Sequence, residues 1–108
     1  MKILVVSEKP VETLFSGLSK THDLVLCKPE DALINLVTEE PNVIFCFAEY
    51  QGNGFENARK AFDDMKRSLP STTKLFRLGF LPEDAQTDEM YLRLPISLRD
   101  IENSLDSL

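Results

Sequence analysis

The sequence has few of the residues that most catalytic and metal sites need. It contains one histidine, His22, no tryptophan and two cysteines among 108 residues. A single histidine in a predicted turn and two cysteines on predicted strands assemble neither a Ser/His/Asp or Cys/His arrangement nor a metal-ligand spacing. We therefore expect that the chain is not an enzyme and that it holds no metal and no cofactor.

Basic residues and long apolar runs are also scarce. Twelve Lys and Arg stand against 18 Asp and Glu, for a formal net charge of -6, whereas a nucleic-acid interface needs a basic face. No stretch approaches the roughly 18–20 apolar residues of a membrane span. Lys2 is followed by only four apolar residues before Ser7, too few for a signal peptide. We expect a cytoplasmic protein without a nucleic-acid or membrane partner.

The two cysteines, Cys27 and Cys46, fall on different predicted strands. If one strand separates them, strand spacing alone places them about 9–10 Å apart. That distance exceeds the reach of a disulfide. We interpret them as two unpaired thiols of the core.

The chain does contain a short run at residues 42–47 that is unbrokenly apolar after Asn42 and lies between a proline and a polar segment. A run of this length, rich in branched and aromatic side chains, is typical of a strand buried on both faces. Similar strands are predicted at residues 2–6, 24–27, 74–78 and 90–94. The run at 42–47 is therefore expected to be the central strand of a sheet.

Helical spacing of apolar residues separates most of these strands. Two helices are predicted to start at Pro10 and Pro29, a long one follows Gly54, and Ser97 with Asp100 forms the N-cap of the last. Their expected inner faces are Val11, Leu14, Phe15 and Leu18; Ala32, Leu33, Leu36 and Val37; Phe55, Ala58, Phe62 and Met65; and Leu98, Ile101, Leu105 and Leu108.

This alternation of strands and helices predicts an α/β fold, with a parallel sheet between two helical layers. Right-handed crossovers favour the flavodoxin-like strand order 2-1-3-4-5. Residues 1–108 are expected to form a single domain, because this length is near the commonest domain size.

The connection between the fourth and fifth strands is short. Only residues 80–88 lie there, whereas a parallel crossover that includes a helix needs at least about 10–12 residues. We predict that the fourth helix is missing or vestigial. One face of the last two strands would then be exposed to solvent.

The residue pattern of these two strands agrees with an exposed face. Leu75 and Arg77 share one face of the fourth strand, and Tyr91 and Arg93 share a face of the fifth. Because arginine is rarely fully buried without a partner, this face is predicted to be exposed. Arginine and tyrosine beside an apolar residue are typical of protein interfaces, so these four residues are the candidate partner surface. In the alternative interpretation, acids of the connector fold over and pair with the arginines: Glu83, Asp84, Asp88 and Glu89.

Three segments together resemble the response-regulator receiver (CheY-like) domains. They are the strand at 2–6 followed by two polar residues, residues 41–44 leading into the central strand, and residues 91–97 leading into the last helix. The resemblance covers essentially the whole chain. It implies the CheY-like variant of the flavodoxin-like fold, and a role in two-component signalling.

The family's chemistry is phosphotransfer to an aspartate at the end of the third strand, with Mg²⁺ held by an acidic pair after the first. By position, the resemblance places the acidic pair on Ser7 and Glu8, so one acid remains. It places the phosphoacceptor on Phe47, or on Ala48 with one residue of slip. A phenyl ring cannot form an acyl phosphate, and one carboxylate is a poor Mg²⁺ site.

Two further functional positions of the family are also changed. The hydroxyl residue at the end of the fourth strand falls near Gly79, and the lysine of the fifth strand falls on Leu94. Without that hydroxyl and ammonium, nothing would stabilise a phosphoryl group. The aromatic switch position falls on Tyr91 and is retained. The chain therefore resembles a degenerate receiver, or pseudo-receiver.

We expect a phosphorylation-independent receiver-like module that regulates signalling by binding a protein partner, or a second copy of itself. A second hypothesis is an atypical phosphoacceptor or small-ligand binder that uses Glu8 and Glu49. A third is the N-terminal regulatory domain of a longer response regulator.

Overall fold

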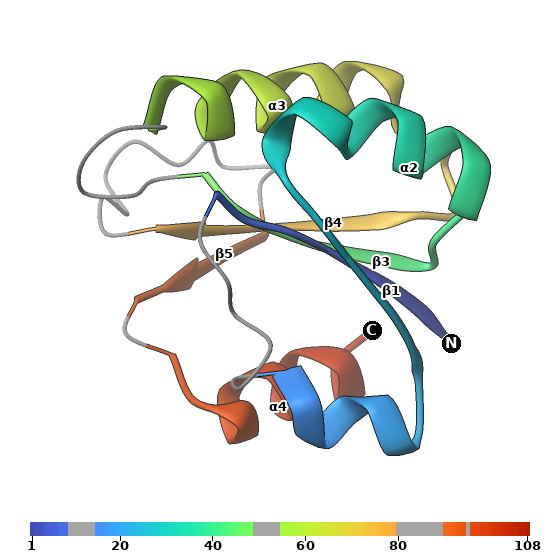
Figure 1. Ribbon diagram of the computed structural model, residues 1–108. Helices are drawn as coiled ribbons and strands as arrows, with labels where there is room; N and C mark the ends of the chain where they lie inside the picture. Colours follow the sequence, from blue (N-terminus) through green and yellow to red (C-terminus); the bar gives the residue numbers. More distant parts are fainter. Residues whose placement is uncertain (9–14, 49–54, 80–89, 95) are drawn as a thin grey trace.

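The computed structural model of the protein describes residues 1–8, 15–48, 55–79, 90–94 and 96–108, with the side chains of 55 and 56 left aside. Its centre is a five-stranded parallel sheet with the order β2-β1-β3-β4-β5 (Figure 1). The strands are β1 (Lys2–Val6), β2 (Asp23–Cys27), β3 (Val43–Phe47), β4 (Lys74–Gly79) and β5 (Met90–Arg93). The predicted strands and their order are confirmed.

Helices cover both faces of this sheet, which gives the three layers expected of an α/β fold. On one face lie α2 (Ala32–Glu39), which follows the 3₁₀ turn η2 (Pro29–Asp31), and α3 (Phe55–Ser68) (Figure 1). On the other lie the 3₁₀ helix η1 (Ser16–Lys20) and α4 (Leu98–Asp106). Among the residues that the structure describes, no helix has both the length and the apolar character needed to cross a membrane.

The sheet separates two apolar cores. The first, beneath η1 and α4, contains the three phenylalanines of the sheet and buries Ile3, Val5, Phe15, Leu18, Val43, Phe45, Phe47, Phe76, Leu78, Ile101 and Leu105. The second, beneath α2 and α3, buries Leu4, Val6, Ala32, Leu36, Ile44, Cys46, Ala48, Ala61, Phe62, Met65 and Leu75. Every residue of β3 is buried, because alternate side chains of this central strand enter the two cores.

The last helix begins as the sequence predicts. The Ser97 Oγ accepts a hydrogen bond from the Asp100 backbone N–H at 3.2 Å, and the Asp100 carboxylate accepts one from the Ser97 N–H at 3.0 Å. This reciprocal pair is a capping box. Ile101 and Leu105 are buried as expected, but Leu108 lies beyond the helix and is exposed.

The predicted inner face of α2 is only half right. Ala32 and Leu36 are buried, but 40% of Leu33 and 74% of Val37 are exposed. The helix is eight residues long and follows a 3₁₀ turn whose Pro29 is buried. It therefore meets the second core along a narrow stripe, and the four apolar positions of the sequence pattern do not all fit that stripe.

Two predictions fall wholly or partly outside the described residues. The first predicted helix starts at Pro10, and its residues 10–14 are outside the described part of the chain. Of its expected inner positions the structure describes Phe15 and Leu18, both buried. The connector that was expected to lack a full fourth helix falls in residues 80–89. Its conformation, and the pairing of its acids with the arginines, stay predictions.

Candidate functional site

The carboxyl ends of the parallel strands meet at one edge of the sheet, and backbone hydrogen bonds continue the pairing there. The N–H of Ser7 donates to the Cys27 carbonyl at 3.0 Å, and the N–H of Leu94 donates to the Gly79 carbonyl at 2.8 Å. The strand order therefore brings the predicted positions after β1, β3, β4 and β5 to this edge. Ligands of open α/β sheets bind at such an edge.

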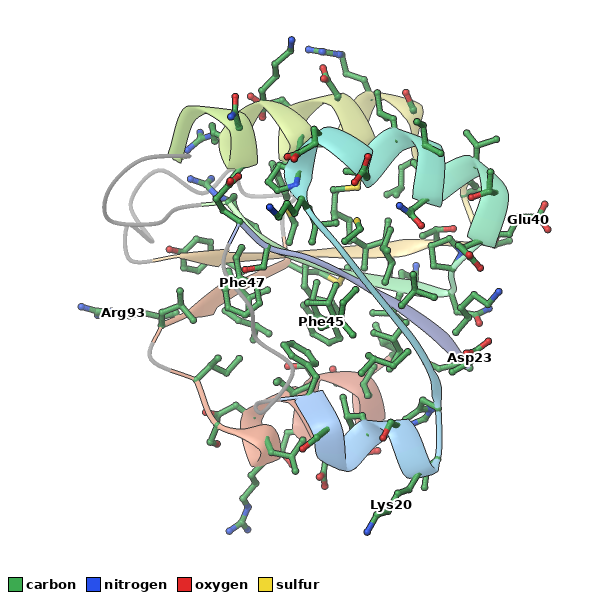
Figure 2. The ribbon with its side chains drawn as sticks, viewed as in Figure 1. Lys20, Asp23, Glu40, Phe45, Phe47 and Arg93 are labelled. Atoms are coloured by element: carbon green, nitrogen blue, oxygen red, sulfur yellow. The ribbon has the colours of Figure 1, made fainter. Side chains whose placement is uncertain are left out.

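Phe47, at the end of β3, places its side chain in the first core. It is 3% exposed, and its ring centroid lies 6.1 Å from that of Phe15 in an edge-to-face arrangement. Figure 2 shows Phe45 and Phe47 on the same side of the sheet, toward η1 and α4. Ala48, the position with one residue of slip, is fully buried. Neither position offers a carboxylate to a phosphoryl donor.

The two positions that the resemblance assigns to the acidic pair, Ser7 and Glu8, also lie at this edge. Ser7 is buried, whereas Glu8 is partly exposed and its Oε2 atom is buried without a hydrogen-bond partner. Within the described residues, no three His, Cys, Asp or Glu side chains come together as metal ligands would. Glu49, the second acid of the alternative hypothesis, lies outside the described residues.

The remaining two positions offer no side-chain charge or hydroxyl. Gly79 is buried and has no side chain, and the partly buried Leu94 packs against the first core. An ammonium or hydroxyl that could contact a phosphoryl group is therefore absent from these two positions, as the sequence indicates.

The predicted exposure of Arg77 is wrong, since this side chain is completely buried. Its guanidinium carbon lies 5.7 Å from the ring centroid of Phe62 on α3 and 5.5 Å from that of Tyr91 on β5. Both distances lie within the range of cation–π attraction. A guanidinium is also weakly hydrated and stacks on aromatic faces, so the two rings favour arginine at this buried position.

The other three residues of the candidate partner surface differ from one another in exposure. Leu75 is 7% exposed and belongs to the second core, so its predicted exposure is also wrong. Tyr91 is partly buried. Arg93 alone is exposed, and it extends from the end of β5 (Figure 2). The four residues therefore do not form one accessible surface.

The two cysteines lie as the sequence predicts, on β2 and β3, with Val6 of β1 between them in the register. Both are free thiols. Burial raises the pKa of the Cys46 thiol far above its usual value. Burial, followed by the charges of Asp31 and Glu30, raises the pKa of Cys27 to about 11. Since the thiolate is the reactive form, neither is an effective nucleophile near neutral pH.

Sequence reasoning missed an exposed apolar face on α2, formed by Leu33, Ile34 and Val37. Ile34 is the residue from which this exposed face could have been predicted. It lies outside the predicted inner stripe, so it must point outward if that stripe faces the core. Val37 follows Ile34 by three residues and Leu33 by four, so it neighbours both on the helix surface.

A comparison with protein-family models gives no match, and a comparison with curated proteins gives none. Solved structures do match. The N-terminal domain of the nisin resistance regulator NsrR is 16% identical with a TM-score of 0.73, over 98% of this chain and 95% of that one. A CheY-like response regulator receiver domain from Methylobacillus flagellatus is 19% identical with a TM-score of 0.72, over 99% and 97%.

A third match is a structure of the histidine kinase ThkA in complex with the response regulator protein TrrA, 17% identical with a TM-score of 0.70, over 98% of this chain and 96% of that one. All three alignments cover nearly the full length of both chains. Together with the strand order β2-β1-β3-β4-β5, they show that this chain has the fold of the response-regulator receiver (CheY-like) domains.

Proposed function

We propose that this chain is a phosphorylation-independent receiver-fold module that acts by binding a protein partner in bacterial signal transduction. The observation that carries the proposal is the packing of Phe47. This residue occupies the position that the family resemblance assigns to the phosphoacceptor, and its ring is an integral part of the first core. A buried phenyl ring has no nucleophilic oxygen and leaves no space for a phosphoryl group.

The other positions at the same edge support the proposal. Leu94 and Gly79 supply neither a cation nor a hydroxyl. The charge of a phosphoryl group needs oriented donors or a cation. A preserved fold without these groups is expected of a domain whose function is to present a surface.

A protein partner is supported by one of the structural matches, which is a complex between a histidine kinase and a response regulator. The strand surface predicted for such a partner retains Arg93 as its exposed member, beside the partly buried Tyr91. Arg93→Glu is expected to weaken the binding of a partner that uses this end of β5. Arg99→Glu, an exposed charge on α4, is the matched control.

Incubation with acetyl phosphate and Mg²⁺, followed by intact-mass measurement, tests the function. We expect no change in mass under conditions that fully phosphorylate an ordinary receiver domain measured in parallel. A gain of one phosphoryl group on the native chain would overturn phosphorylation independence.

A second candidate function is an atypical phosphoacceptor that uses Glu8. The specific observation in its favour is the buried Oε2 atom of Glu8, which has no hydrogen-bond partner. A desolvated carboxylate oxygen at the carboxyl edge would gain from a nearby cation, or from attack on acetyl phosphate, which forms an acyl phosphate and releases acetate. The same mass measurement on Glu8→Gln distinguishes the two functions, because a phosphoryl gain that this variant abolishes would assign the acceptor to Glu8.

A further inference from the structure

The outer side of α2 carries a contiguous apolar face, formed by Leu33, Ile34 and Val37, which we call the α2 face. The exposed fractions of these side chains are 40%, 64% and 74%. Isolated exposed apolar residues are ordinary, but neighbouring ones on a single helix indicate an interaction site. Most other apolar residues that the structure describes belong to the two cores or pack against them.

The α2 face continues into a pocket of about 540 Å³ at the end of the sheet opposite the carboxyl edge. Its apolar lining is Leu33, Leu36, Val37, Pro41 and Pro70, and its polar lining is Glu40, Asn42, Ser68, Thr72 and Thr73. A pocket beside an exposed apolar helix face can receive one large apolar side chain. Buried anchors of this kind contribute most of the binding energy in protein interfaces.

Acidic residues flank the α2 face at both ends. Glu30 precedes Leu33 by three residues and Glu40 follows Val37 by three, and both are exposed. Glu40 extends outward at the carboxyl end of α2 (Figure 2). Residues 29–42 contain two further acids and no Lys or Arg. One of these acids, Glu39, is already paired with Lys2 at 2.9 Å.

We propose that the α2 face binds an amphipathic helix of a partner protein, with apolar side chains at steps of three and four residues and a Lys or Arg at each end of that stripe. The two basic residues would meet Glu30, in the 3₁₀ turn η2 that precedes α2, and Glu40, the residue that follows α2. An apolar helix face laid into a groove is a recurrent mode of recognition. The flanking charges set its orientation and select the partner.

The same charges argue against two other occupants. In a symmetric pair of α2 helices, Glu30 would lie opposite Glu40 of the second copy in an antiparallel pair, and opposite its own equivalent in a parallel one. Like charges in such positions are destabilising. An anionic membrane surface would be repelled by these acids as well.

This inference rests on the proposed function, because both treat the chain as a binding module, but the two can fail separately. A phosphoryl gain in the mass measurement would overturn the function and leave binding at the α2 face unaffected. Failure of a partner helix to bind at the α2 face would overturn this inference and leave phosphorylation independence unaffected.

The test is a fluorescence-anisotropy titration of the full chain with a labelled helical peptide that has leucines at steps of three and four residues and a lysine at each end of the stripe. We expect saturable binding. It should weaken at least about tenfold with Ile34→Lys/Val37→Lys, and similarly when the two peptide lysines are replaced by glutamate. Glu102→Lys, an exposed position on α4, should bind like the native chain. Circular dichroism checks that each variant is folded.

Four results would overturn the proposal. One is no binding of the lysine peptide up to millimolar concentration, and another is equal binding by the folded double variant. The third is dimerisation of the native chain in sedimentation velocity that the double variant abolishes, which would assign the face to a second copy. The last is retention of the native chain on anionic phospholipid vesicles, lost in the double variant.

Discussion

The guanidinium of Arg77 lies 5.5 Å from the ring centroid of Tyr91, its register partner on the neighbouring strand. On the side of α3, the same guanidinium is 5.7 Å from the ring of Phe62. Arg77 therefore connects the edge strand β5, its own strand β4 and the helix above them through one buried cation. A residue that the sequence pattern assigns to the surface is part of the internal packing.

Arg77→Ala is expected to destabilise the protein. The substitution removes a large buried side chain and two cation–π contacts, and it should lower the free energy of unfolding by about 2–4 kcal/mol. Urea denaturation followed by circular dichroism measures the change. Arg99→Ala should stay within about 0.5 kcal/mol of the native chain, because Arg99 is exposed. Equal effects of the two substitutions would show that Arg77 does not contribute to the packing.

Phe47→Asp, which places an aspartate where the family resemblance expects one, is predicted not to restore a phosphoacceptor. The carboxylate would lie in the first core against Phe15, whose ring also contacts Phe45, and burial of an unpaired charge there should cost more than about 4 kcal/mol. We expect loss of the folded circular-dichroism spectrum, whereas Phe47→Leu should remain folded. A stable Phe47→Asp protein that gains a phosphoryl group would contradict this account.

The sequence predicts this fold well where a residue pattern is compatible with only one local structure. The apolar run of β3 and the Ser97–Asp100 cap are of this kind, because full burial and N-capping are local consequences of residue type. It fails where the answer depends on a neighbour that is distant in the chain. The burial of Arg77 depends on Phe62 of α3, and the exposure of Val37 depends on how α2 meets the sheet.

The candidate site shows the same contrast between what residue type determines and what packing determines. The changed residue types at Phe47, Gly79 and Leu94 are visible in the sequence, since the loss of a functional group needs no geometry. The exclusion of Leu75 from the partner surface, and the presence of the α2 face, required the packed structure, because exposure is a property of the assembled layers.

Ser97→Ala is expected to lower the free energy of unfolding by about 1 kcal/mol, the usual contribution of an N-cap side chain. The hydrogen bonds from the Ser97 N–H and Oγ lower the pKa of Asp100 below its ordinary value. The Asp100 carboxylate therefore contributes stability above about pH 4. This contribution disappears as the pH falls through the lowered pKa.

The stability difference between the native chain and Asp100→Asn should consequently be present at pH 7 and shrink under strongly acidic conditions. Thermal unfolding at several pH values measures it. Glu102→Gln, an exposed position on the same helix that takes no part in the capping box, is the control variant. A difference that grows on acidification would exclude the cap as its source.

The thiols should react slowly in the folded protein. Because the pKa of Cys27 is raised to about 11, its alkylation by iodoacetamide at pH 8 should be at least about tenfold slower than in urea. Cys46, which is fully buried, should react more slowly still. Peptide mass mapping separates the two sites. Rapid labelling of Cys46 in the native chain would show that the second core is open.

The raised pKa values also determine the behaviour in alkali. In the unfolded chain a thiol ionises near its ordinary pKa of 9.0, whereas Cys27 in the folded protein ionises at about 11. The neutral thiol therefore favours the folded state below about pH 9, and this contribution is lost as the pH rises toward 11. Cys27→Ser should reduce the loss of stability over that interval.

The most direct test of phosphorylation independence is an amide NMR spectrum recorded with Mg²⁺ and beryllofluoride, a stable mimic of a phosphoryl group on a carboxylate. The account predicts no change in the signals of Ser7, Ala48 and Leu94, whose N–H groups lie at the carboxyl edge of the sheet. Saturable shifts of these three signals, absent with Mg²⁺ alone, would show a working phosphoryl site and contradict the account.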